Sequence, residues 1–108
     1  MNGNNFRKAQ VFYDDKLAGI IEEIDEGYRF TYNDEFLKKK ISISLSLPHK
    51  EKIHQSKELF PFFEGLIAEG WFLKVICSTL KVDENDKFGI LIKSCSDCIG
   101  AVSVKEFD

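Results

Sequence analysis

Residues Leu59–Trp71 read LFPFFEGLIAEGW, and the periodicity of the chain changes within this stretch. Before it, apolar and polar residues alternate, which is typical of strands. After it, apolar residues recur at helical spacing, and a last strand-like segment closes the chain. This order predicts an α+β fold in which a small antiparallel sheet is packed on one side by about three short helices.

The expected strands are separated by clusters of turn residues. Asp14-Asp15-Lys16 predicts the turn of a hairpin, and Asp25-Glu26-Gly27 predicts a second turn. After that turn, Tyr28, Phe30 and Tyr32 share one face of a strand. The expected strands are Ala9–Tyr13, Leu17–Ile24, Tyr28–Tyr32, Ile41–Leu47 and Gly100–Val104.

Ile41–Leu47 has the strictest alternation, because each of its apolar residues is followed by serine or by Pro48. It predicts a strand with one apolar face, which either packs in the core or forms a sheet edge that pairs with a partner. Pro48 is expected to end this strand, and His49–Lys57 is expected to be a charged loop.

The second half of the chain predicts helices. We expect them over Leu59–Ile67, over Glu69–Lys81, and from an N-cap at Asp83 to about Lys93. The third would bury Phe88, Leu91 and Ile92. A polar connection over Asn33–Lys40 has room for one helical turn. Residues 1–7 are expected to be a flexible tail, and residues 8–108 a single domain.

Composition excludes several classes of protein. The net charge is −3 with both signs interspersed, so no basic stripe is available for autonomous nucleic-acid binding. No apolar run approaches the ~18–20 residues that span a bilayer, and the polar N-terminus does not resemble a signal peptide. Three cysteines argue against a disulfide framework and favour a reducing cytoplasm.

Trp71 is the leading candidate for a binding residue. At about 100° per residue, it lies nearly opposite the stripe formed by Leu73, Ile76, Cys77 and Leu80. Exposed tryptophan at a corner between a loop and a helix is a common anchor of protein interfaces. The alternative is that Trp71 folds back over the phenylalanines before it, since aromatic side chains are usually buried.

No catalytic or metal-binding constellation stands out. Cys95 and Cys98 form a C-x-x-C pair, and His49 and His54 could complete a zinc set, but no second cysteine pair is present. We expect Cys98 to be a small core residue and predict no metal site and no cofactor. Glu64 and Glu69 have no nucleophile, histidine or phosphate-binding loop beside them in the sequence, so the chain is not expected to be an enzyme.

The order of the motifs resembles the N-terminal subdomain of the HipA kinase toxins. This family opens with a strand-turn-strand like Lys8–Gly19 and an aromatic strand like Tyr28–Tyr32. It continues with an I-S-L-S-L-P segment, here Ile43–Pro48, and with a P-F-F-x-x-L-x-x-E-G-W segment, here Pro61–Trp71. D-C-I-G-A-V, here Asp97–Val102, closes the motif order. The resemblance covers Lys8–Val104.

The resemblance implies a binding protein. HipA proteins continue into a kinase domain, whereas this sequence ends at Asp108, so catalytic machinery is not expected. In split systems a freestanding HipS chain binds a HipT kinase and neutralises it, beside a HipB-like DNA-binding protein. The resemblance is strongest to HipS and implies an antitoxin that docks on a HipT-like kinase through Glu69, Gly70, Trp71 and Phe72. The alternative is a structural subunit that completes the kinase, or bridges it to a HipB-like protein, without inhibiting it.

Overall fold

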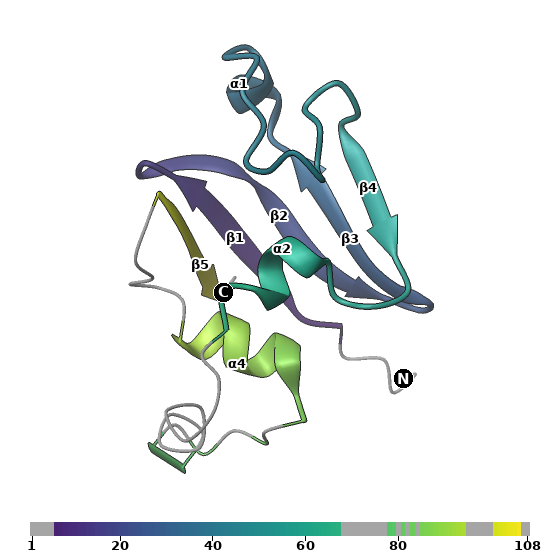
Figure 1. Ribbon diagram of the computed structural model, residues 1–108, viewed down its shortest axis with the longest axis vertical. Coiled ribbons are helices and arrows are strands. Elements are labelled where there is room, and N and C mark those ends of the chain that lie inside the picture. Colours follow the sequence, from purple (N-terminus) through teal and green to yellow (C-terminus); the bar gives the residue numbers. More distant parts are fainter. Residues whose placement is uncertain are drawn as a thin grey trace.

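The computed structural model describes residues 6–67, 78–79, 81, 83, 85–94 and 101–106 (Figure 1). Within these ranges the chain forms one sheet and three helices that are long enough to be named. The strands are β1 (Lys8–Tyr13), β2 (Lys16–Ile24), β3 (Gly27–Tyr32), β4 (Ile53–Ser56) and β5 (Val102–Glu106). The helices are α1 (Asp34–Leu37), α2 (Pro61–Glu64) and α4 (Lys87–Ser94).

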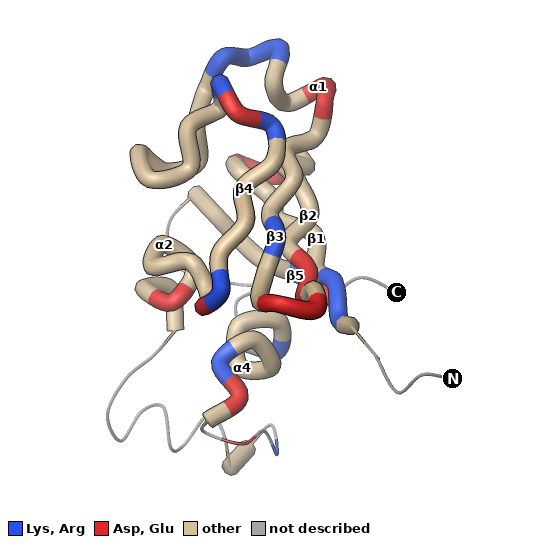
Figure 2. Tube along the Cα trace, turned by 90° about the vertical axis from the view of Figure 1, so that its right-hand side faces the viewer, with Lys and Arg blue, Asp and Glu red and all other residues tan. Residues whose placement is uncertain are grey.

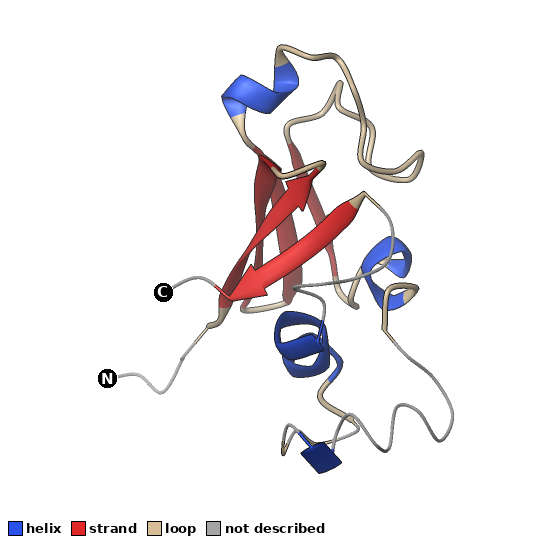
Figure 3. Cartoon of the chain, turned by 90° about the vertical axis from the view of Figure 1, so that its left-hand side faces the viewer, coloured by secondary structure: helices blue, strands red, loops and turns tan. Residues whose placement is uncertain are grey.

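The sheet has the strand order β4-β3-β2-β1-β5, and every neighbouring pair is antiparallel. β5 lies beside the first strand, with Val104 opposite Val11. Helices α2 and α4 lie on one side of the sheet, and α1 lies beyond its end (Figure 3). The predicted α+β fold, an antiparallel sheet covered on one side by short helices, is therefore confirmed.

The turns form where the sequence predicts them. Asp14 and Asp15 both have positive φ, at 50° and 67°, as a tight two-residue hairpin requires. Aspartate tolerates this backbone region better than most residues. At the second turn Gly27 has a φ of 142°, and a Cβ there would lie 2.1 Å from the Ser56 carbonyl oxygen. Only glycine therefore fits at position 27, where the start of β3 lies against the end of β4.

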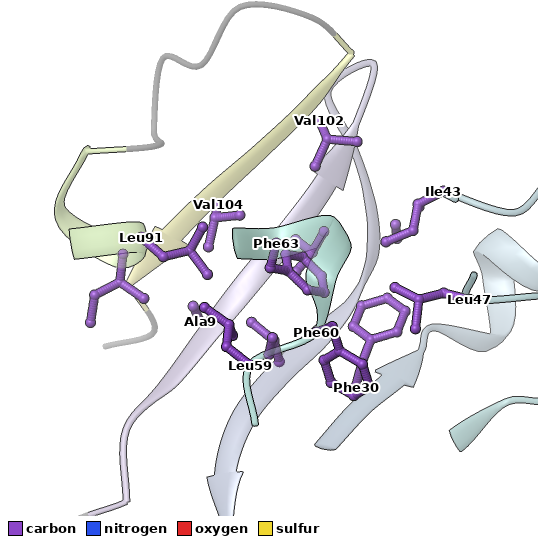
Figure 4. Close-up of a cluster of buried hydrophobic side chains, with 14 of the residues drawn as sticks. Ala9, Phe30, Ile43, Leu47, Leu59, Phe60, Phe63, Leu91, Val102 and Val104 are labelled. Carbon is purple, nitrogen blue, oxygen red and sulfur yellow. The ribbon is translucent and has the colours of Figure 1, made fainter. Parts of the chain in front are cut away.

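The core lies between the sheet and the two covering helices (Figure 4). Phe30 on β3 is fully buried, and its ring centroid lies 5.7 Å from that of Phe63 on α2 and 4.8 Å from that of Tyr32. Edge-to-face and tilted contacts of this kind stabilise aromatic clusters beyond the area they bury. The other buried members come from strands, loops and helices alike: Ala9, Val11, Ala18, Ile21, Phe36, Ile43, Leu47, Leu59, Phe60, Phe88, Leu91, Ile92, Val102 and Val104.

The predicted strand over Ile41–Leu47 is wrong. Ile43 and Leu47 are buried as expected, but the segment between them is a turn closed by a bridge between Ser44 and Leu47. The Leu47 N–H donates to the Ser44 carbonyl at 3.0 Å, and the Ser44 hydroxyl accepts from the Ser46 N–H at 3.2 Å. Serine hydroxyls bind nearby backbone in this way and compete with strand pairing. Leu45 is consequently 98% exposed.

Tyr32 fastens this turn to the sheet. Its hydroxyl donates to the Leu47 carbonyl and accepts from the Ile43 N–H at 3.0 Å. Burial raises the pKa of the Tyr32 hydroxyl, which therefore stays protonated and available as a donor. The segment 41–47 is thus held at both of its buried residues by one side chain.

Three further expectations need correction. The loop expected over His49–Lys57 contains the edge strand β4, which has a single apolar residue, Ile53, and therefore shows no strand pattern in the sequence. The first predicted helix shortens to α2 followed by a turn. The cap of the last predicted helix is Asp86 and not Asp83, because the Asp86 carboxylate accepts from the Gly89 N–H at 3.1 Å. The predicted turn of helix after Asn33 is confirmed as α1.

We predict that Tyr32→Phe lowers the free energy of unfolding by about 1–3 kcal/mol, because the change leaves the Leu47 carbonyl and the Ile43 N–H without their partner. Urea unfolding measures this difference. Tyr13→Phe is the matched control, since no hydrogen bond from the half-buried Tyr13 hydroxyl is recorded among the described residues, and it should leave stability nearly unchanged. Equal stabilities of the two variants would contradict the role given to Tyr32.

Candidate partner-binding surface

Helix α2 lies shortly before Glu69–Phe72 in the sequence, the residues predicted to bind a partner. Pro61 occupies the first turn, where its missing N–H costs nothing. Phe60 and Phe63 are buried beneath the helix, and Leu66 and Ile67 after it pack partly against the same core. Apolar packing therefore fixes the position of the chain as far as Ile67.

The four residues predicted to bind a partner, Glu69, Gly70, Trp71 and Phe72, lie outside the described residues. So do Cys95 and Cys98 of the C-x-x-C pair, and most of the helix predicted over Glu69–Lys81. Their roles stay predictions.

An ion pair joins α2 to α4. Glu64 binds the Lys87 ammonium, and this carboxylate raises the pKa of Lys87. Glu64, which the sequence left without a chemical role, is therefore a structural contact between the two helices. Beside the pair lies an open, mostly polar cleft of about 280 Å³. Its lining residues are Tyr28, Lys57, Glu58, Leu59, Glu64, Asn85, Asp86 and Lys87.

Arg7 connects the start of β1 to the start of α4. Its guanidinium binds Glu23 at 2.9 Å and Asp86 at 2.8 Å, and lies 5.4 Å from the ring centroid of Phe88. The Arg7 N–H also donates to Glu23. A Cβ at Gly89 would lie 2.3 Å from an Asp86 carboxylate oxygen, so a larger residue there would have to displace this carboxylate. Arg7, expected in the flexible tail, thus belongs with the folded part of the chain.

This arrangement shifts the titration of both carboxylates. Hydrogen bonds from Arg7 are the largest cause of the lowered pKa of Glu23 and of Asp86, and they outweigh the opposing effect of burial. The same two carboxylates raise the pKa of Arg7. All three groups are therefore charged at neutral pH and hold each other in place.

The two histidines are occupied by local contacts. The Nδ1 atom of His49 lies 2.8 Å from the Ser42 hydroxyl, and the Nε2 atom of His54 donates to the Pro48 carbonyl at 3.0 Å. Throughout the part of the chain that the structure describes, His, Cys, Asp and Glu side chains do not gather in groups of three that could hold a metal ion. The two rings thus tie the segment 42–49 to itself and to β4.

The largest exposed apolar side chains lie mainly near the α1 end of the sheet. Leu45 is 98% exposed, Ile53 on β4 52% and Ile41 40%, whereas Phe6 precedes β1 at the other end. Sequence reasoning missed the exposure of Leu45 because Leu45 alternates with serine in the same way as the buried Ile43 and Leu47. Serines on both sides of Leu45 were the signal for a turn.

Comparison with known proteins adds the relationship that this geometry alone does not supply. The sequence profile described as the HipA N-terminal domain matches residues 9–105. A solved structure titled "N-terminal domain of HipA toxin" has a TM-score of 0.74 and 30% sequence identity, covering 94% of this chain and 93% of that one. The chain belongs to the HipA N-terminal domain family.

A relative in Haemophilus influenzae (strain ATCC 51907 / DSM 11121 / KW20 / Rd) carries only the description "Uncharacterized protein". It is 32% identical over 100 residues, which span 93% of this chain and 92% of the relative. As a HipA N-terminal domain, the chain is related to a subdomain of a toxin and not to its catalytic kinase domain. No helix within the described ranges is long and apolar enough to cross a membrane.

We predict that acid destabilises the HipA N-terminal domain partly through Asp86 and Glu23. Carboxylates whose pKa is lowered by folding stabilise the protein above their unfolded pKa, and this stability is lost as the pH falls through the folded pKa. The free energy of unfolding should therefore fall from about pH 5 to about pH 2. Asp86→Asn keeps a capping oxygen and loses the charge, so its decline should be shallower.

Urea unfolding at several pH values in this window measures the difference. Asp83→Asn is the control: the Asp83 carboxylate accepts a hydrogen bond from the Asn85 N–H, and no ion pair of Asp83 is recorded among the described residues. Its profile should lie closer to that of the wild type than the Asp86→Asn profile does. Parallel profiles for Asp86→Asn and wild type would refute a charged contact between Arg7 and Asp86.

Proposed function

We propose that this chain is a non-catalytic antitoxin that binds a HipA-like serine/threonine kinase, as HipS binds HipT, and neutralises its kinase activity. The observation that carries the proposal is the match to the HipA toxin's N-terminal domain, which extends over residues 9–105. A domain of this family has a kinase as its natural neighbour. Such a chain acts in the bacterial cytoplasm, where its target is made.

The proposed role of the chain is binding and not catalysis. Three of the described carboxylates take part in structural ion pairs: Glu64 pairs with Lys87, and Asp86 and Glu23 pair with Arg7. His49 contacts the Ser42 hydroxyl, and His54 on β4 donates to the Pro48 carbonyl. The proposed binding unit is one domain over residues 8–108.

The proposed contact is the corner formed by Glu69, Gly70, Trp71 and Phe72. Trp71 is the anchor, with Glu69 and Phe72 beside it, and Gly70 gives the backbone the freedom that a corner needs. Helix α2, fixed by Phe60 and Phe63, provides a rigid base before this segment. A rigid base favours binding because less conformational freedom is lost on association.

We expect the purified chain to inhibit a HipA-like kinase from the same organism. Phosphorylation by that kinase should fall to background as the concentration of the chain rises, because the bound chain blocks turnover. A radiolabelled phosphate transfer assay measures this. Binding without any loss of kinase activity would contradict an antitoxin, and would favour a structural subunit that completes the kinase or bridges it to a HipB-like DNA-binding protein.

Trp71→Ala should weaken binding to the kinase by roughly 30- to 1000-fold, about 2–4 kcal/mol, because an interface anchor of this size fills a desolvated pocket. Isothermal titration calorimetry gives the affinity, and circular dichroism checks that the variant is folded. In the wild type, tryptophan fluorescence should shift to the blue as kinase is added. Unchanged affinity of a folded variant would remove Trp71 from the interface.

A further inference from the structure

We propose that the segment 41–47 and the lysines beside it form a second docking surface, which inserts Leu45 into an apolar pocket with an acidic rim on the partner kinase. This inference rests on the proposed function, because it takes the kinase as the partner. It concerns residues that the structure describes and that are separate in sequence from the Trp71 corner. Below, this segment with its lysines is called the Leu45 surface.

The Leu45 surface has a fixed shape. Ile43 and Leu47, on either side of the tip, are buried and are held through their backbones by the Tyr32 hydroxyl. Across the tip, the Ser44 and Ser46 hydroxyls lie 2.9 Å apart, and Ser44 also accepts from the Ser46 N–H. Binding through such a turn loses little conformational entropy, because the bound shape already exists.

A second contact closes the base of the segment. The Ser42 hydroxyl accepts from the His49 N–H at 2.8 Å and also contacts the ring of His49. The chain thus uses the hydroxyls of all three serines, together with two buried residues, to hold Leu45 in solvent. A single exposed leucine is ordinary on a protein surface, but one presented at 98% exposure by a turn this restrained has the form of an interface anchor.

The segments that flank the turn in sequence are basic, although the protein as a whole is acidic. Residues 34–52 carry five lysines and three acidic residues, against a net charge of −3 for the chain. The lysine-bearing segments 38–40 and 50–52 lie together at one end of the molecule (Figure 2), where Lys52 binds Asp34 at 2.8 Å. This end therefore differs in charge from the remainder of the surface.

Several of these lysines are available to a partner. Lys38 pairs with Glu35 and Lys52 with Asp34, whereas Lys39, Lys40 and Lys50 are exposed and have no ion pair among the residues that the structure describes. Complementary charge at the rim of an interface raises the association rate and excludes wrong partners. The matching surface on the kinase is therefore an apolar pocket with carboxylates around it.

Leu45→Ser tests the apolar part of this surface. Because Leu45 is almost fully exposed, the change should not affect folding. Affinity for the HipA-like kinase should fall at least about ten-fold. Phe6→Ser is the matched control. Phe6 is also an exposed apolar residue but lies beyond the start of β1, at the end of the sheet away from α1. It should bind like the wild type.

Charge reversal tests the rim. Lys39→Glu should slow association with the kinase and make the association rate less sensitive to salt. Lys57→Glu is the same change at an exposed lysine after β4, and its association rate and salt dependence should stay closer to those of the wild type. Surface plasmon resonance at several salt concentrations measures the rates. Identical behaviour of Lys39→Glu and Lys57→Glu would overturn the proposed acidic rim.

Four results would overturn the inference, and they separate it from the proposed function. If the wild type inhibits the kinase and Leu45→Ser does so equally well, the Leu45 surface is refuted and the antitoxin function stands. If the wild type does not bind the kinase, both fail. Binding to phosphatidylglycerol vesicles that Leu45→Ser abolishes would assign the surface to a membrane. A dimer that Leu45→Ser dissociates, measured by sedimentation, would assign it to a second copy of the chain.

Discussion

Three aromatic residues on one face of β3 hold every described helix of this domain. Tyr28 packs on Phe88 of α4 with ring centroids 5.7 Å apart, Phe30 packs on Phe63 of α2, and Tyr32 stacks on Phe36 of α1 at 6.1 Å. The two-residue period of a strand puts these rings in one row. Because the row spans the length of β3, a single strand determines where all three helices lie and where the turn over residues 41–47 is fastened.

The sequence predicted this row and the α+β arrangement because both depend on local periodicity. It failed at Ile41–Leu47, where alternation of apolar residues with serine fits a strand and a serine-stabilised turn equally well. What decided between them was the Tyr32 hydroxyl, a partner distant in sequence that binds the turn at Ile43 and Leu47. The edge strand β4 was missed because only one of its four residues, Ile53, is apolar, so it carries no alternating pattern.

For the candidate site, the sequence identified a family but not the surface that the structure exposes. Helical geometry and the family resemblance predict the residues of the Trp71 corner, and these residues lie outside the described ranges. Leu45 could not be found by periodicity, because its exposure follows from hydrogen bonds among serine hydroxyls and backbone. The two proposed contacts have different physics: one is a large aromatic anchor, and the other a small apolar tip with a basic rim. An interface that uses both gains affinity from the first and orientation and association rate from the second.

The pairing of β5 with β1 has a consequence for how the domain is made in the cell. The first strand emerges from the ribosome early, but its outer edge finds its partner only after residues 102–106 have been synthesised. Until then β1 presents unpaired backbone groups to other nascent chains. The sheet can therefore close only after translation has passed residue 106, so a ribosome that stalls before that point leaves the edge of β1 unpaired and open to aggregation.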